Sequence, residues 1–136
     1  MEKLMGWFAV LAAAGTLGSA AGASGAHKSV LERHAGAGVV VMARDGEDGT
    51  ARRAVANDAH LAFIEEVFER ILVAGPLYAQ DSRQVIGSLY VLDVKSLAEA
   101  RELIEADPFY QAGVWTEIDY LPYLPAAGTW VGGTVW

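Results

Sequence analysis

Three residues in the middle of this chain have side chains that could move a proton or stabilise the charge it leaves behind. His60 lies in NDAHLAFIEEVFERI, which we expect to form an amphipathic helix that starts near Asn57. Asp45 follows the apolar run VVVMAR, and Arg53 lies between the two. A histidine side chain titrates near neutral pH, a carboxylate on its second ring nitrogen raises its basicity, and an arginine can stabilise an oxyanion. The sequence therefore predicts His60, Asp45 and Arg53 as catalytic residues for acid–base chemistry on a small polar substrate.

The residue types exclude several other chemistries. The chain of 136 residues has no cysteine, so a thiolate nucleophile, a disulfide and a thiolate metal site are impossible. No Ser–His triad spacing is present, which favours a lyase or isomerase type of reaction without a covalent intermediate. The histidines and acids show no metal-ligand spacing and no glycine-rich phosphate loop follows a strand, so we expect no metal and no cofactor. A net charge of −7 disfavours nucleic acid as a partner.

The order of apolar patterns predicts an α+β fold of the ferredoxin-like βαββαβ type. Strands are expected at 39–44, 72–76, 85–94 and 115–123, and helices at about 57–71 and 97–106. The first helix has helical spacing of the apolar residues Leu61, Ile64, Val67, Phe68 and Ile71. An acid at a strand end and a histidine at a helix start can meet over one rim of such a sheet.

Two helices cover only one face of a four-stranded sheet, so the other face needs a cover. We expect that face to carry Val39, Val41, Leu89 and Val91, which are too apolar to be left to water. A second subunit that packs sheet to sheet is the simplest cover. We therefore predict a homodimer or a hetero-complex that uses this face and the apolar tail at 124–136, which contains Trp130 and Trp136.

Several short motifs, taken in order, resemble the YciI-like (YCII-related) protein family. They are ARDG at 43–46, the approach from Arg53 to His60, AGP at 74–76, GSL at 87–89, SLAEARELIEADPF at 96–109 and AGVW at 112–115. The resemblance runs from about Val39 to Tyr123 and implies a dimeric α+β barrel with a His–Asp pair in a pocket near the sheet. Carried onto this chain, the histidine is His60, and its partner is Asp45 first and Asp107 second. Asp107 and Gly75 are then candidates for substrate binding.

The first part of the chain departs from that family pattern. Residues 4–26 include no charged residue, and the run is long enough to cross a bilayer as a helix. A retained anchor that contacts membrane lipid or a partner transmembrane helix is one interpretation, and a cleaved signal with small residues at 21–23 is another. We expect an apolar segment at 1–27, a linker at 28–38, the YCII-like domain at 39–123 and a tail at 124–136.

Two functions follow for such a chain. The first is a YCII-like acid–base enzyme tethered to a membrane by a single N-terminal span, or else exported or directed to an organelle as a soluble protein. The second is a non-catalytic accessory subunit of a membrane protein complex that reuses the same scaffold. The enzyme requires an open pocket of a few hundred Å³ around His60, on the order of those that bind small molecules. The accessory subunit does not require one.

Overall fold

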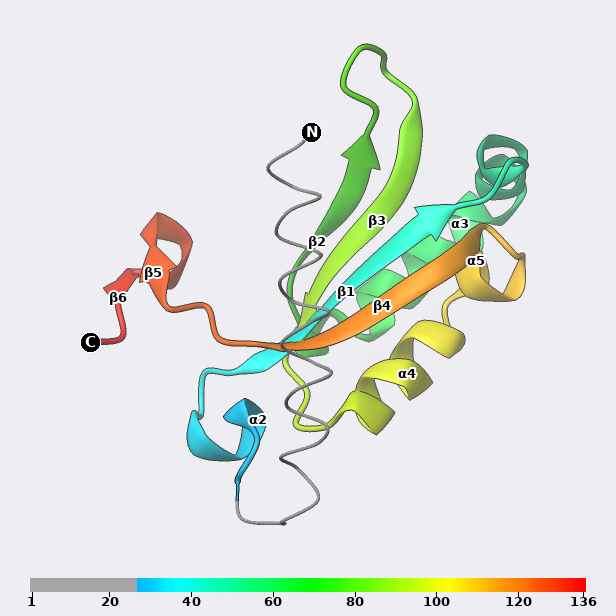
Figure 1. Cartoon of the computed structure of the whole chain (residues 1–136). Coiled ribbons are helices and arrows are strands. Elements are labelled where there is room, and N and C mark those ends of the chain that lie inside the picture. The colour runs from blue at the N-terminus through cyan, green and yellow to red at the C-terminus, as the bar shows by residue number, and fades with distance from the viewer. Residues whose placement is uncertain (1–26) are drawn as a thin grey trace.

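A computed structural model describes residues 27–136 (Figure 1). Its centre is an antiparallel four-stranded sheet in the order β2-β3-β1-β4. The strands are β1 (Gly38–Asp45), β2 (Ile71–Tyr78), β3 (Val85–Leu92) and β4 (Trp115–Tyr123). The helices are α2 (Val30–Arg33), α3 (Gly49–Glu66), α4 (Leu97–Glu105) and α5 (Pro108–Gln111), with a 3-10 turn η1 (Phe68–Arg70) after α3. The order β1-α3-β2-β3-α4-β4 is the predicted ferredoxin-like α+β arrangement.

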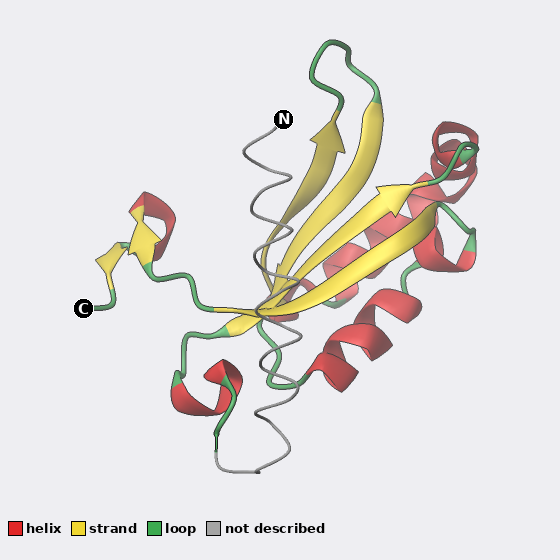
Figure 2. Ribbon diagram, viewed as in Figure 1, coloured by secondary structure: helices red, strands yellow, loops and turns green. Residues whose placement is uncertain are grey.

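Helices α3, α4 and α5 lie on one side of the sheet, and the core forms between them and the strands (Figure 2). Val39 and Val41 of β1 are fully buried in this core. Met42 pairs with Leu89, and successive strand residues point to opposite faces, so Leu89 shares the far face with Met42. The prediction that Val39 and Val41 share a face with Leu89 and Val91 is therefore wrong. Covering of the far face by a second subunit stays a prediction.

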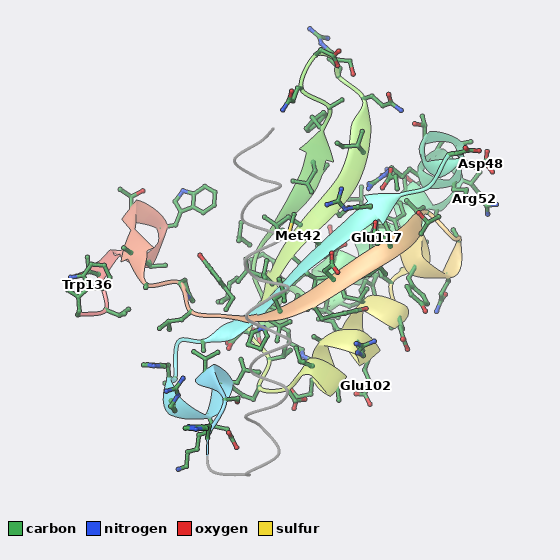
Figure 3. All side chains as sticks on the ribbon, viewed as in Figure 1. Met42, Asp48, Arg52, Glu102, Glu117 and Trp136 are labelled. Carbon is green, nitrogen blue, oxygen red and sulfur yellow. The ribbon has the colours of Figure 1, made fainter. Side chains whose placement is uncertain are left out.

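Helix α3 begins at Gly49, about two turns earlier than predicted. The stretch between the turn at 45–49 and His60 is rich in alanine and arginine, which favour a helix strongly. An ion pair between Asp48 and Arg52, at 3.9 Å, spans the first turn and is visible in Figure 3. Asn57 is consequently an exposed residue within the helix and not its cap. Arg53 and His60 are thereby placed two turns apart on a single helix.

The apolar face of α3 also differs from the predicted one. Ile64 and Val67 pack against the core, whereas the Leu61 side chain is 52% exposed. Phe68 and Ile71 lie beyond the end of α3, in η1 and β2, and Phe68 is 69% exposed. Because the helix starts earlier and ends before Phe68, the face that packs on the core is displaced toward the start of the helix, where Ala56 is buried.

Helices α4 and α5 follow each other directly, because the C-cap of α4, Ala106, is next to the N-cap of α5, Asp107. Ser96 caps α4 by accepting a hydrogen bond from the Glu99 backbone at 3.0 Å. Asp107 caps the next helix, α5, by accepting a hydrogen bond from the Phe109 backbone at 2.8 Å. Asp107 is fully buried as a result, between α4 and α5. This placement brings its carboxylate under the sheet.

The segment before β1 and the segment after β4 lie at the same end of the sheet, because Gly38, the first residue of β1, pairs with Tyr123, the last residue of β4. The C-terminal tail forms a small hairpin of β5 (Ala127–Gly128) and β6 (Gly133–Thr134), which projects from the sheet (Figure 1). Within residues 27–136, no helix has both the length and the apolar character needed to cross a membrane. The predicted anchor at 4–26 lies outside the described residues, so a membrane span stays a prediction.

Candidate functional site

A cavity of about 400 Å³ lies beside the two-turn stretch of α3 that carries Arg53 and His60. Its other walls come from β2, β3 and α5. The lining residues are Arg53, Asn57, His60, Leu61, Ile64, Ala74, Gly75, Pro76, Val85, Ser88, Tyr90 and Phe109. Largely apolar walls with a few convergent polar groups are typical of sites for small molecules. The volume lies within the range of roughly 300–1,000 Å³ that is usual for small-molecule sites.

His60 is held in this cavity by a buried carboxylate. Its Nδ1 lies 2.8 Å from Oδ1 of Asp107, whose side chain is fully buried. An ionised carboxylate only accepts hydrogen bonds, so Nδ1 carries the hydrogen and donates it. Among residues 27–136, Nε2 has no hydrogen-bond partner and is the ring nitrogen left for a ligand. This is the tautomer that a general base needs.

Two further groups fix the Asp107 carboxylate. Tyr90 donates its phenol hydrogen to Oδ2 at 3.0 Å, and the Phe109 backbone N–H donates to Oδ1 at 2.8 Å. Burial and the neighbouring Asp107 charge raise the pKa of Tyr90 far above its ordinary value, so the phenol stays protonated and remains a donor. The His60 ring also stacks on Phe109, with centroids 3.7 Å apart and planes 10° from parallel. The imidazole therefore has one defined position.

Arg53 belongs to a second, separate cluster. Its Nε and Nη2 atoms donate to the two oxygens of Asp45 at 2.7 and 2.8 Å, and Nη2 also donates to Ser88 Oγ at 2.9 Å. Both side chains of this ion pair are largely buried, at 14% and 6% exposure. The guanidinium lies 4.9 Å from the centre of the Phe109 ring. Its Nη1 has no hydrogen-bond partner in the part of the chain that the structure describes, and it remains available to a ligand.

The structure thus places four of the predicted site residues in two pairs, Asp45 with Arg53 and His60 with Asp107. Asp45 bonds to Arg53 and not to His60, because the early start of α3 places Arg53 over the end of β1. His60 lies two turns further on, where α5 begins, so its partner is Asp107. Gly75 lines the cavity, and its contact with a substrate stays a prediction, whereas Asp107 is buried behind His60 and does not line the cavity. The predicted substrate contact of Asp107 is wrong for this reason.

The sequence interpretation missed Ser88, Tyr90 and Phe109. Ser88 and Tyr90 are two residues apart on β3, so both point to the helical side of the sheet. A hydroxyl on each of two alternate positions of an apolar strand was the available signal. Phe109 gave no signal, because a phenylalanine after Asp–Pro is equally suited to a core.

The fold and the site together define a class of protein: a small α+β domain with a buried Asp–His pair at the edge of a cavity. A model of the YCII-related domain matches residues 21–123 of the chain. Protein YciI of Escherichia coli O6:H1 is 32% identical over 91 residues, which span 62% of this chain and 93% of that protein, and protein YciI of Shigella flexneri matches equally. The chain belongs to the YCII-related family, as the motifs predicted.

The fold is also similar to that of a solved enzyme structure. This enzyme is 5-chloro-2-hydroxyhydroquinone dehydrochlorinase from Burkholderia phenoliruptrix AC1100, in complex with 2,5-dihydroxybenzoquinone. The TM-score is 0.56 at 23% identity, over 67% of this chain and 95% of that one. At this identity the likeness establishes the antiparallel α+β fold alone.

Proposed function

We propose that this chain is an acid–base enzyme in which His60 removes a proton from a small oxygen-bearing substrate in the 400 Å³ cavity. The observation that carries the proposal is the 2.8 Å contact between His60 Nδ1 and the buried Asp107 carboxylate. It leaves Nε2 as a base on the cavity side, in a ring that Phe109 holds in place. We propose that the reaction needs no cofactor.

The proton transfer creates charge at two places, and the site has a group for each. His60 becomes a cation next to the Asp107 anion, which stabilises it. The electron pair of the broken C–H or O–H bond moves into a new double bond, and an adjacent leaving group departs with its own pair, or an oxygen becomes an enolate. The imidazolium then returns its proton to the product or to solvent.

Arg53 is the group that would meet the developing oxyanion. Asp45 already compensates its charge, so the contribution comes from the oriented Nη1 hydrogens and not from net positive charge. One preorganised donor of this kind contributes about 10²–10³ in rate. Asp45 and Ser88 aim the guanidinium and are positioning residues in this scheme.

The reaction named for the structural neighbour, a dehydrochlorination of a hydroxylated ring, needs the same groups. We therefore propose elimination or isomerisation on a small hydroxylated ring as the reaction type, and 5-chloro-2-hydroxyhydroquinone as the probe. Chloride release by the full chain is expected. His60→Gln is expected to lower kcat/KM by about 10²–10⁴, because the amide cannot take up a proton.

His34→Gln is the matched control for this experiment. His34 is exposed and lies just before β1, outside the cavity, so the same change there should leave chloride release unaltered. Absence of chloride release by the wild-type chain would contradict the proposed reaction. Full chloride release by His60→Gln would reject His60 as the base.

A second candidate function, a subunit of a larger assembly, is favoured by the C-terminal tail. Residues 124–136 include no charged residue. Trp130 and Trp136 are 88% and 84% exposed, and Figure 3 shows Trp136 at the far end of the tail. Tryptophan is enriched among the residues that contribute most of the binding energy near the centre of protein interfaces. We propose that the tail and the far sheet face bind a second copy of this chain or a partner chain, and that residues 4–26 attach the assembly to a membrane.

Self-association of the purified chain tests the tail. Trp130→Ser combined with Trp136→Ser is expected to raise the dissociation constant of the dimer about 100-fold or more, since a buried interface tryptophan contributes about 2 kcal/mol or more. Sedimentation equilibrium measures the constant. His60→Gln, which changes the cavity alone, should leave it unchanged. A dimer unaffected by the two serines would remove the tail from the interface, and a monomeric wild type would reject self-association.

A further inference from the structure

A second cavity, of about 600 Å³, continues the first one along α3. The two share Arg53, Asn57 and Val85 as lining residues, so they form one groove. Thr50, Arg53 and Asn57 recur at helical spacing and place the groove along a single face of α3. The far end of the groove is formed by the hairpin between β2 and β3, through Arg83 and Gln84.

The charge of this end is unusual for an acidic chain. The lining residues of the second cavity include two arginines and no carboxylate. Arg53 is compensated by Asp45, but Arg83 has no ion pair or hydrogen bond with any residue in 27–136. Asp81, on the same hairpin, makes no ion pair with Arg83 and does not line the groove. Arg83 therefore brings uncompensated positive charge to the groove, in a protein of net charge −7.

The turn that carries Arg83 is closed by two hydrogen bonds. The Ala79 N–H donates to the Gln84 carbonyl at 2.9 Å, and the Gln84 N–H donates to Ser82 Oγ at 3.2 Å. These bonds hold the backbone on both sides of Arg83, so the position of its Cα atom is fixed. A guanidinium presents a planar fork that matches a carboxylate in two parallel hydrogen bonds.

We propose that Arg83, together with Gln84, binds a carboxylate of the substrate whose reacting end lies at His60. The inference rests on the proposed function, since it names the substrate class of the same site. The second cavity lies along residues 50–57 of α3, and the middle of this stretch is roughly 10 Å from His60 along the helix axis, at 1.5 Å per residue. An arginine side chain covers part of that distance. The substrate is thus an elongated acid, with an oxygen-bearing ring at one end and a carboxylate on a short chain at the other.

Two isosteric probes test the carboxylate directly. They are 3-(2,5-dihydroxyphenyl)propanoate and its uncharged amide, whose dissociation constants are measured by calorimetry on the full chain. The wild type is expected to bind the acid about 10-fold more tightly than the amide, as one well-placed charge pair of about 1.4 kcal/mol provides. Arg83→Gln should abolish this preference and leave the binding of the amide unchanged.

Arg70→Gln is the matched control, because it makes the same charge change on an exposed arginine of η1 that lines neither cavity. It should keep the preference for the acid. Equal binding of the two probes by the wild type, no binding of either probe, or an unchanged preference in Arg83→Gln would each overturn the subsite.

His60→Gln separates this inference from the proposed function. Since Arg83 acts in binding and not in proton transfer, His60→Gln should retain the preference for the acid even when chloride release is lost. A lost preference in Arg83→Gln alongside full chloride release by His60→Gln would preserve the anion subsite and reject the base.

Discussion

Replacing Asp107 with alanine is expected to lower the free energy of unfolding by about 3–5 kcal/mol. The side chain is fully buried, and three groups donate hydrogen bonds to it: His60 Nδ1, the Tyr90 phenol and the Phe109 backbone. Alanine leaves all three donors without an acceptor and opens a gap beneath the sheet. The unfolding free energy from urea denaturation of the full chain measures the effect.

Asp107→Asn separates the shape of this residue from its charge. The amide oxygen can still accept from the Phe109 backbone and His60, and the amide N–H can donate to the Tyr90 oxygen, so we expect a smaller loss, about 1–2 kcal/mol. Asp93→Ala is the surface control, since Asp93 is half-exposed and 3.8 Å from Lys95, and its effect should stay within about 0.5 kcal/mol. An Asp107→Ala chain as stable as the wild type would show that the Asp107 network does not hold α5 to the sheet.

The predictable part of this molecule is what local pattern encodes. The two long helices, the β3 and β4 strands and the Ser96 cap follow from periodicity and from short-range hydrogen bonding, and the structure has each of them. His60 and Arg53 could be proposed as site residues because their side chains can transfer a proton and stabilise an oxyanion. These two residues could therefore be proposed from their types alone, and both line the cavity.

The pairing of the site residues was not predictable in the same way. The helix was expected to start near Asn57, yet the alanines and arginines before that residue extend α3 back to Gly49. Those two turns decide whether His60 lies near the end of β1 or over the start of α5, and hence whether Asp45 or Asp107 becomes its partner. The partner is set by long-range packing, which no local pattern reports.

The prediction of which residues share a face of the sheet was wrong for a related reason. In a strand that is apolar on both faces, such as β1, alternation gives no signal as to which residues meet the helices. Only the pairing of Met42 with Leu89 fixes the parity of β1 against β3. The same parity places Ser88 and Tyr90 under α3.

The pair of Arg53 and Asp45 gives the second large effect. Arg53→Met is expected to lower the free energy of unfolding by about 3–5 kcal/mol, because it leaves the Asp45 carboxylate, whose side chain is 6% exposed, without its two hydrogen bonds. The double variant Arg53→Met with Asp45→Leu removes the stranded charge and should recover most of that loss. Urea denaturation of the wild type, both single variants and the double variant gives the coupling energy.

A matched pair on the surface sets the scale for that coupling. Arg44 and Glu117 lie 3.7 Å apart with side chains 53% and 68% exposed, so their coupling should stay below about 1 kcal/mol. Additive losses at Arg53 and Asp45 would mean that the pair is not coupled in solution. The double variant also separates folding from function: because it lacks Arg53 Nη1, the apolar pair should restore the fold, while chloride release from 5-chloro-2-hydroxyhydroquinone should still fall by about 10²–10³. Stability regained together with that loss of turnover is the result that the proposed role of Arg53 requires.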